Sequence, residues 1–368
     1  MNLPPLSVAP RLDRLRAAFA AAQVDALLVT RLPNIRYLTG FTGSAAMVLV
    51  TEQGVTFTTD GRYAEQSGEQ LAAAGVEAQI EIGATQADQR DALAAAAAAA
   101  GVARVGLEAH GVTWAQQRDI AGWFGAAELV ATDHVVETLR LVKEEAEVAR
   151  IRAACAIGDA AFAEVRPMLA SGPTEQEVAL ALEWAMRTRG ASGNSFDPIV
   201  AAGPNAAKPH ARPSARRIEP GELVVLDFGC IVDGYCSDMT RTVSVGPPNA
   251  ASQGLVDVVR EAQANGRDAV RAGAAAADVD RACRDIIDSA GLGEYFVHST
   301  GHGVGLEIHE APRVAKTAGD ILEAGFVVTV EPGVYVPGVG GVRVEDTLVV
   351  TYDGADPLTL APKDLVVA

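Results

Sequence analysis

Three of the six histidines in this chain lie within the thirteen residues from His298 to Glu310, among three glycines. Histidine is the commonest metal ligand and can also donate or accept protons near neutral pH. Glycine lets the backbone approach a bound group closely. A structural histidine usually stands alone, so this density predicts a catalytic or metal-binding loop.

Two acidic residues directly follow apolar runs that are typical of buried strands. Asp227 follows Leu223–Leu226, and Glu331 follows Phe326–Val330. A carboxylate that is buried in its ionised form is costly unless it meets a cation or strong hydrogen bonds. We therefore expect a cation beside these strand ends.

Local structure should bring two further acids to the same place. Asp238 lies beyond the Asp233–Gly234 pair, whose composition favours a tight hairpin turn, so the chain can return beside Asp227. Arg343 and Glu345 are two residues apart in a strand-like segment, so we expect both to point to one face.

Four carboxylates and one imidazole carry too much negative charge for one divalent ion and suit two. Such ions are held about 3.5–4 Å apart, with a shared hydroxide as the nucleophile. An oxygen-rich set with one nitrogen favours Mn²⁺, with Co²⁺, Fe²⁺ or Zn²⁺ as alternatives. Any one of these acids alone is more often a cap, turn or salt-bridge residue, and only the joint pattern favours a metal centre.

Other candidate ligands are interpreted as structural residues. Cys230 and Cys236 flank the acids, but small buried residues are the commoner explanation for them. His110 and His134 appear as isolated residues in the first part of the chain, and we expect no chemistry from them.

The elements that must position these residues indicate a mixed α/β (α+β) fold in two domains. A length of 368 residues favours two domains, and residues 11–100 alternate between helical and strand-like segments. A long helix with an apolar stripe is predicted from about residue 143 to Val165. We place the boundary near 140, giving domains 1–140 and 141–368.

The composition excludes several classes of partner. A formal net charge of −17 argues against nucleic acid, whose phosphates require a basic face. The alanine-rich segment 92–100 is too short and too weakly hydrophobic to span a membrane. The N-terminus does not read as a signal peptide, so a cytoplasmic protein is expected.

At these residues the chain resembles the pita-bread metallopeptidases, and within them the Xaa-Pro peptidases prolidase and aminopeptidase P. The resemblance covers nearly the whole chain and implies a creatinase-like N-terminal domain before a pita-bread catalytic domain. The motifs that carry it are Asn34–Phe41, Thr59–Tyr63, Leu226–Gly229, Ser237–Arg241, His298–Glu310, Glu331–Tyr335 and Gly341–Asp346.

The resemblance also implies a set of site residues, all of matching type in this chain. The metal ligands would be Asp227, Asp238, His302, Glu331 and Glu345. Asp238 and Glu345 would bridge two ions. Further family positions near the reaction are His210, His298, His309, Tyr335 and Arg343.

The expected reaction is hydrolysis of the bond between an N-terminal residue and a following proline. Glu331 would take and relay the proton of the attacking water, and His309 would stabilise the charge on the tetrahedral intermediate. His210 and His298 would position the substrate, and Tyr335 and Arg343 would contribute to its binding. An Xaa-Pro bond has no amide N–H, so a pocket shaped to the proline ring would provide recognition.

Several alternatives remain open from the sequence. A methionine aminopeptidase shares the fold and ligand types, creatinase shares the architecture without these metals, and some relatives are non-enzymatic binding modules. The five intact ligands and the large N-terminal domain favour the Xaa-Pro group. The sequence does not decide between dipeptidase and aminopeptidase, although Arg36 or another first-domain side chain could contribute. The resemblance suggests a homodimer.

Overall fold

The computed structural model describes residues 3–367, which form two compact units. Pro5–Arg140 form the first unit, and the other described residues, including Leu3 and Pro4, form the second. Each unit combines helices with β-sheet, which confirms the mixed α/β class. No helix in the described part of the chain is long and apolar enough to cross a membrane.

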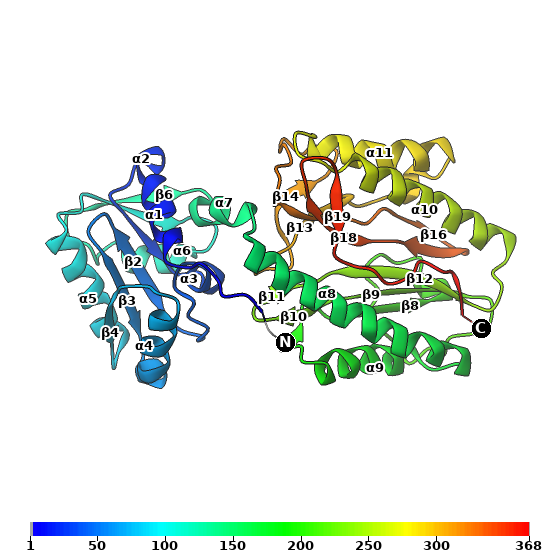
Figure 1. Ribbon diagram of the computed structural model, residues 1–368, viewed down its shortest axis with the longest axis horizontal. Helices are drawn as coiled ribbons and strands as arrows, with labels where there is room; N and C mark the ends of the chain where they lie inside the picture. The colour runs from blue at the N-terminus through cyan, green and yellow to red at the C-terminus, as the bar shows by residue number, and fades with distance from the viewer. Residues whose placement is uncertain (1–2, 368) are drawn as a thin grey trace. The chain divides into compact units, whose positions relative to one another are not determined.

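The first unit is built on a six-stranded mixed sheet with the order β4-β3-β2-β1-β5-β6 (Figure 1). Its strands are β1 (Ala26–Val29), β2 (Met47–Thr51), β3 (Val55–Thr59), β4 (Gln79–Ile82), β5 (Arg104–Glu108) and β6 (Glu128–Thr132). Its α-helices are α1 (Pro10–Ala17), α2 (Phe19–Ala22), α3 (Leu32–Thr39), α4 (Ala64–Ala73), α5 (Gln86–Ala99), α6 (Trp114–Ile120) and α7 (Val135–Leu141). Leu93 of α5 packs with Leu28 and Leu107 of the sheet in one apolar core.

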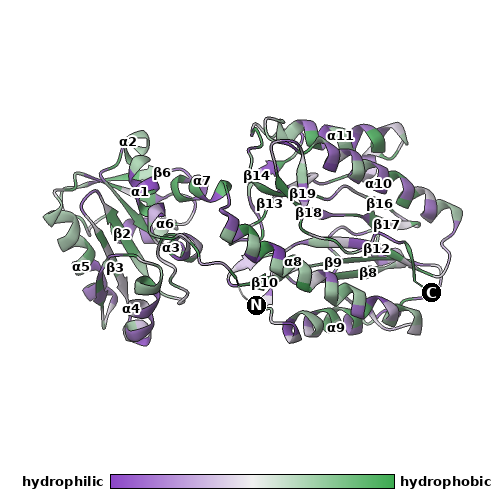
Figure 2. Ribbon diagram, in the orientation of Figure 1, coloured by the Kyte–Doolittle hydropathy of each residue, from purple (hydrophilic) through white to green (hydrophobic). Residues whose placement is uncertain are grey.

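The second unit places its strands between two pairs of helices (Figure 1). The helices are α8 (Glu145–Val165) and α9 (Glu175–Thr188) on one side, and α10 (Ala250–Ala269) and α11 (Ala276–Ser289) on the other. Figure 2 shows that the strands are mostly hydrophobic, whereas the helices also carry hydrophilic residues. One sheet packs mainly against α8 and α9 and the other mainly against α10 and α11, so each helix pair covers apolar strand residues, as an apolar sheet requires.

Two larger sheets and two small ones make up the strands of the second unit. One sheet has the order β20-β12-β9-β8, formed by β8 (Ile199–Ala202), β9 (Leu223–Phe228), β12 (Met239–Val245) and β20 (Val366–Val367). The other has the order β14-β13-β15-β18-β19, formed by β13 (Gly301–Gly303), β14 (Glu310–Val314), β15 (Val327–Val330), β18 (Asp346–Val350) and β19 (Ala355–Pro357). The small sheets contain β7 (Gly193–Asn194), β10 (Cys230–Val232) and β11 (Tyr235–Cys236), and the hairpin of β16 (Gly333–Val336) and β17 (Gly340–Arg343).

The predicted long helix is confirmed as α8, which begins at Glu145. Its apolar stripe, including Ile151, Cys155 and Phe162, is buried. Phe162 stacks near Phe228 of β9, with ring centroids 6.4 Å apart. The helix therefore supports the strand that carries Asp227.

The predicted hairpin turn at Asp233–Gly234 is also confirmed. Both residues have positive φ, 44° and 79°, and they join β10 to β11 with Val232 opposite Tyr235. Positive φ at both central positions is the backbone of a type I′ turn, which suits the twist of paired strands. The turn sends the chain back along β9, as the sequence predicted.

The expectation of one continuous strand through Arg343 and Glu345 is wrong. β17 ends at Arg343, and β18 begins at Asp346 in a different sheet. The break occurs where the backbone N–H of Glu345 donates to the carbonyl of Thr240, at 3.1 Å. Both Arg343 and Glu345 nevertheless face the same cavity.

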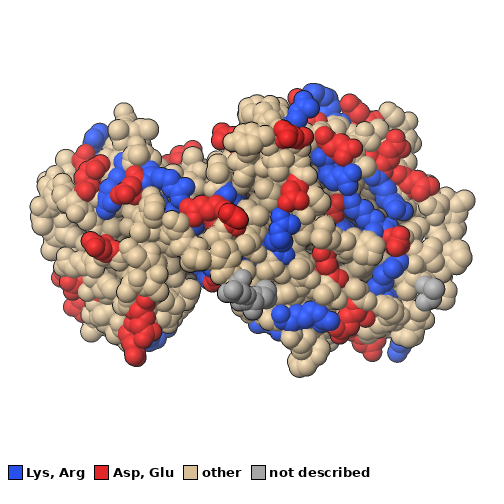
Figure 3. Space-filling model, viewed as in Figure 1, with Lys and Arg blue, Asp and Glu red and all other residues tan. Residues whose placement is uncertain are grey.

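The remaining predictions from composition concern the surface and the cysteines. On the face shown in Figure 3, acidic and basic side chains are interspersed.

All four cysteines are buried and free. Burial raises the pKa of Cys230 to about 11 and that of Cys236 to about 12, so these thiols stay protonated and are poor metal ligands.

Candidate metal centre

One cavity of about 890 Å³ in the second unit collects the predicted site residues. All of them except Tyr335 line its wall: His210, Asp227, Asp238, His298, His302, His309, Glu331, Arg343 and Glu345. They come from strands and loops far apart in the sequence, and the pairing of these strands brings them together.

The two larger sheets each contribute a pair of carboxylates. In the β20-β12-β9-β8 sheet, β9 and β12 are antiparallel, with Phe228 opposite Met239. Asp227 precedes Phe228 and Asp238 precedes Met239, so the two aspartates come from adjacent strand ends. In the other sheet β15 and β18 are antiparallel, with Val330 opposite Asp346. Glu331 directly follows β15, and Glu345 directly precedes β18, so this pair also lies at one sheet edge.

His302 lies on β13 and turns one nitrogen toward the carboxylates. Its Nδ1 is 3.0 Å from the carbonyl of Gly303, which can only accept, so Nδ1 carries the proton. Its Nε2 lies 3.5 Å from Asp238 Oδ2 and 3.5 Å from Glu331 Oε1. Burial lowers the pKa of His302 to about 4, so the ring is neutral and Nε2 offers a lone pair.

The carboxylates are buried with too little positive charge to balance them. Burial raises the pKa of Glu331 to about 8. Burial and the neighbouring acids raise the pKa values of Asp238 and Glu345 well above their ordinary range. Among the described residues, neither Asp227 Oδ1 nor Glu345 Oε1 has a hydrogen-bond partner, although both atoms are buried.

These observations fit divalent cations held by the cavity. Ligand atoms of Asp238, His302 and Glu345 lie within 4.8 Å of one another. A buried polar atom without a partner is rare and calls for an ion or water. Four carboxylates around one neutral imidazole supply the oxygen-rich donor set that Mn²⁺ and similar ions prefer.

A chain of hydrogen bonds runs from Asp227 behind the cavity wall. The Arg343 guanidinium donates to the carboxylate of Asp227 and to the hydroxyl of Tyr335. The Tyr335 hydroxyl donates to His298 Nε2 at 2.9 Å, since His298 Nδ1 donates to the carbonyl of Ser299 at 2.8 Å. Tyr335 thus supports Arg343 and His298 from outside the cavity lining.

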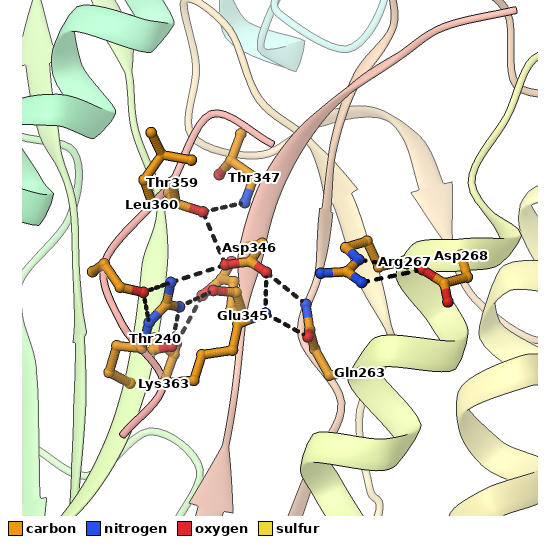
Figure 4. A network of polar contacts seen from close by, with 12 residues as sticks. Thr240, Gln263, Arg267, Asp268, Glu345, Asp346, Thr347, Thr359, Leu360 and Lys363 are labelled. Atoms are coloured by element: carbon orange, nitrogen blue, oxygen red, sulfur yellow. Dashed lines mark hydrogen bonds and ion pairs between the residues drawn. The ribbon is translucent and has the colours of Figure 1, made fainter. Parts of the chain in front are cut away.

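A second polar layer holds Glu345 from both sides. Thr240 Oγ1 donates to Glu345 Oε2 at 2.7 Å, and Arg241 donates to the Glu345 carbonyl. Figure 4 shows the adjacent Asp346 at the centre of a buried network. Its carboxylate accepts hydrogen bonds from Arg241, Gln263, Thr359 and Lys363. This network anchors the start of β18 and hence the backbone of Glu345.

The loop that carries His309 is held by an ion pair. Lys143 Nζ lies 3.1 Å from Glu310 Oε2, and both side chains are buried. The imidazole of His309 itself remains exposed to the cavity, and its ring meets that of His302 edge to face with centroids 4.4 Å apart. The ring of His309 therefore faces the cavity beside the ring of His302, while the ion pair of Glu310 anchors the backbone next to it.

Further residues, which were not predicted from the sequence, complete the cavity wall. Arg313 of β14 lies directly opposite His302 of β13, and Arg212 also lines the cavity. Phe196, Pro198 and Ile199 supply an apolar wall. Only the β13–β14 register shows that Arg313 is a neighbour of His302, and the sequence does not specify that register.

Two family models match the chain. A model described as metallopeptidase family M24 matches residues 149–352, and one described as the creatinase/prolidase N-terminal domain matches residues 11–142. Both matches agree with the two units seen in the structure.

The chain is similar in sequence and in structure to proteins named Xaa-Pro dipeptidase or X-Pro aminopeptidase. An Xaa-Pro dipeptidase of Pyrococcus horikoshii is 35% identical over 93% of this chain and 95% of its own length. The structure of an Xaa-Pro dipeptidase from Bacillus anthracis has a TM-score of 0.93 and 41% identity, covering 98% of this chain and 99% of that one. An X-Pro aminopeptidase from Thermotoga maritima has a TM-score of 0.88 and 34% identity, covering 97% and 100%.

Proposed function

Because this chain belongs to metallopeptidase family M24, we propose that it hydrolyses the bond between an N-terminal residue and a following proline. The observation that carries the proposal is the pair of buried, unpartnered oxygens, Asp227 Oδ1 and Glu345 Oε1, in a cavity that also holds Asp238, Glu331 and a neutral His302. In a binding module without metal these buried carboxylates would only destabilise the fold, because no cation would compensate their charge.

The proposed ligands are Asp227, Asp238, His302, Glu331 and Glu345. Asp238 and Glu345 would be shared by two divalent ions, and Mn²⁺ would suit the set because it is rich in oxygen. When bound, the metal pair lowers the pKa of a water molecule and polarises the scissile carbonyl.

The chain's own residues carry the proton and the developing charge. Glu331 is the proposed group that accepts the proton of the attacking water and passes it to the leaving proline nitrogen. His309 is the proposed donor to the oxyanion, since its ring is exposed to the cavity beside His302. His210 also lines the cavity with an exposed ring and is proposed to contact the substrate.

The Arg343–Tyr335–His298 chain is proposed to shape the substrate pocket. Both nitrogens of His298 already have partners, so we propose that it positions the substrate by packing rather than by a new hydrogen bond. Arg343 contacts the carboxylate of Asp227, so we propose that it also fixes the orientation of that ligand.

Two features of the cavity favour proline dipeptides. Phe196, Pro198 and Ile199 provide an apolar wall that suits a rigid proline ring. Arg313 brings an exposed guanidinium next to His302, and a guanidinium binds a free carboxylate well. We therefore propose that Arg313 binds the carboxylate of the C-terminal proline, which makes the enzyme primarily a dipeptidase.

We also propose a cytoplasmic homodimer. Four buried free cysteines are expected in a reducing compartment. Leu180 and Trp184, one turn apart on α9, are 65% and 71% exposed, and such an apolar pair supports association with a second copy. Analytical ultracentrifugation should show a dimer that Trp184→Ser weakens, and a monomer at micromolar concentration would contradict this assignment.

A panel of three peptides with Mn²⁺ tests the proposed reaction. Ala-Pro should be hydrolysed fastest and Ala-Pro-Ala more slowly, and Met-Ala should not be cleaved. Cleavage of Met-Ala in preference to both proline peptides would indicate a methionine-aminopeptidase-like enzyme. Failure to cleave any of the three in the metal-loaded protein would overturn the proposed function.

A further inference from the structure

Two histidines of the first unit lie side by side, although the sequence suggested that each is isolated. The rings of His110 and His134 are stacked, with centroids 4.0 Å apart and planes inclined by 6°. Asp133 Oδ1 lies 2.6 Å from His110 Nε2 and 3.6 Å from His134 Nε2. The interpretation of these histidines as isolated residues is therefore wrong.

The register of two parallel strands explains why the rings meet. β5 and β6 pair in parallel, with Glu108 opposite Thr132. The backbone N–H of Ala109 continues this pairing by donating to the carbonyl of Thr132 at 3.1 Å. His110 and His134 each lie two residues beyond the paired positions, so both project from the carboxyl ends of the strands. This edge of an α/β sheet is where ligands commonly bind.

The backbone around each histidine is held in place by hydrogen bonds. After His110, the N–H of Gly111 donates to the carbonyl of Glu108 at 2.9 Å. The carbonyl of His134 accepts from both N–H and Oγ1 of Thr138, at 2.8 and 2.7 Å. His134 has a φ of +50°, a left-handed conformation that is uncommon outside glycine.

The side chains of the cluster remain open to solvent. Those of His110, His134 and Asp133 are 57%, 51% and 79% exposed. Their ligand atoms all lie within 4.8 Å of one another. An ion can therefore enter from solvent, and the exposed rings can tilt out of their stacked arrangement so that their nitrogens point to it, at the distance of about 2.0–2.2 Å that such ligands adopt.

We propose that His110, Asp133 and His134 form a second metal site, within the first unit, for a nitrogen-preferring divalent ion such as Zn²⁺, Ni²⁺ or Cu²⁺. Two imidazole nitrogens and one carboxylate oxygen suit these ions better than Mn²⁺. The ion would lie between His110 Nε2 and Asp133 Oδ1 in place of their direct contact, and water would complete its coordination. This donor set differs from the carboxylate-rich set of the second unit, so the two sites select different metals.

Copper binding to the full-length protein tests this site. The wild type, His110→Ala and His134→Asn are first loaded with Mn²⁺, then exposed to Cu²⁺ and freed of loose metal by gel filtration. Asparagine tolerates the left-handed backbone at position 134. The wild type should retain one more Cu²⁺ per chain than either variant, and its difference electron paramagnetic resonance spectrum should show two coupled nitrogens. Any exchange of metal in the catalytic cavity affects the three proteins equally.

The control variant is Glu128→Gln, which removes an exposed carboxylate from the same strand β6 outside the cluster. It should retain the additional Cu²⁺, and all variants should hydrolyse Ala-Pro with Mn²⁺ at the wild-type rate. Equal copper content in the wild type and the two histidine variants would overturn the proposal. Loss of the additional ion in Glu128→Gln would also overturn it, because general surface charge would then explain the binding.

Discussion

Replacing Thr240 by valine should weaken metal binding without changing any ligand. Thr240 Oγ1 donates to Glu345 Oε2 at 2.7 Å and accepts from Arg343 Nε at 3.1 Å. Valine has nearly the same shape but cannot form either bond. The other Glu345 oxygen, Oε1, has no hydrogen-bond partner among the described residues, so Thr240 is central to the orientation of this carboxylate.

The size of the effect follows from the type of bond that is lost. A hydrogen bond to a charged group contributes about 1.5–3 kcal/mol. Loss of a partner that orients a metal ligand typically lowers metal affinity about 10- to 100-fold. The two ranges agree, since a factor of ten corresponds to about 1.4 kcal/mol. We expect the Mn²⁺ dissociation constant of Thr240→Val to rise by about 10- to 100-fold.

Electron paramagnetic resonance of free Mn²⁺ measures this constant directly, and Thr132→Val is the matched control. Thr132 is also buried and donates through Oγ1, at 2.8 Å to the carbonyl of Leu107, but in the first unit. Both variants should lose some thermal stability, and only Thr240→Val should lose metal affinity. A Mn²⁺ affinity within twofold of wild type in Thr240→Val would refute the assigned role of Glu345.

Four further predictions address ligands, catalysis, specificity and pH. Glu345→Ala should lose bound metal, and a full metal complement by elemental analysis would argue against its role as a ligand. His309→Ala should keep its metal while kcat falls about 10²- to 10³-fold, as for loss of an oxyanion donor; unchanged turnover would exclude that role. Arg313→Met should raise KM for Ala-Pro much more than for Ala-Pro-Ala, whereas an equal change for both peptides would contradict carboxylate binding. In the metal-free protein the pKa of Glu331 is raised from 4.5 to about 8, so the folded state holds a proton that the unfolded state releases. The contribution of Glu331 to stability should therefore fall as pH rises from about 4.5 to about 8. The metal-free wild type should lose Tm relative to Glu331→Gln between pH 5 and pH 8, and a Tm difference between the two proteins that stays constant over this range would contradict this.

The sequence was most informative where chemistry and strand pattern coincide. Asp227 and Glu331 were recognisable because a charged residue at the end of an apolar run is costly unless it has a function. The turn at Asp233–Gly234 was predictable because its composition favours positive φ. Local rules of this kind depend on neighbouring residues only, so they do not require knowledge of the tertiary structure.

Features that depend on long-range pairing could not be predicted in the same way. Arg313 meets His302 only through the register of β13 and β14. His110 and His134 meet only because β5 and β6 are parallel and in register. Lys363, near the end of the chain, reaches Asp346 through the tertiary fold. No local sequence pattern specifies these contacts.

The most direct test of the metallopeptidase assignment is the rate of Ala-Pro hydrolysis as a function of bound Mn²⁺. Chelator-treated protein should be inactive and should regain activity as Mn²⁺ is added, reaching its maximum when two ions are bound per chain. Asp227→Asn should not reach that maximum rate at any ratio of Mn²⁺ to protein. Full activity in the chelator-treated protein would contradict the metallopeptidase assignment. A maximum rate that is reached before any Mn²⁺ is bound in the cavity would contradict it as well.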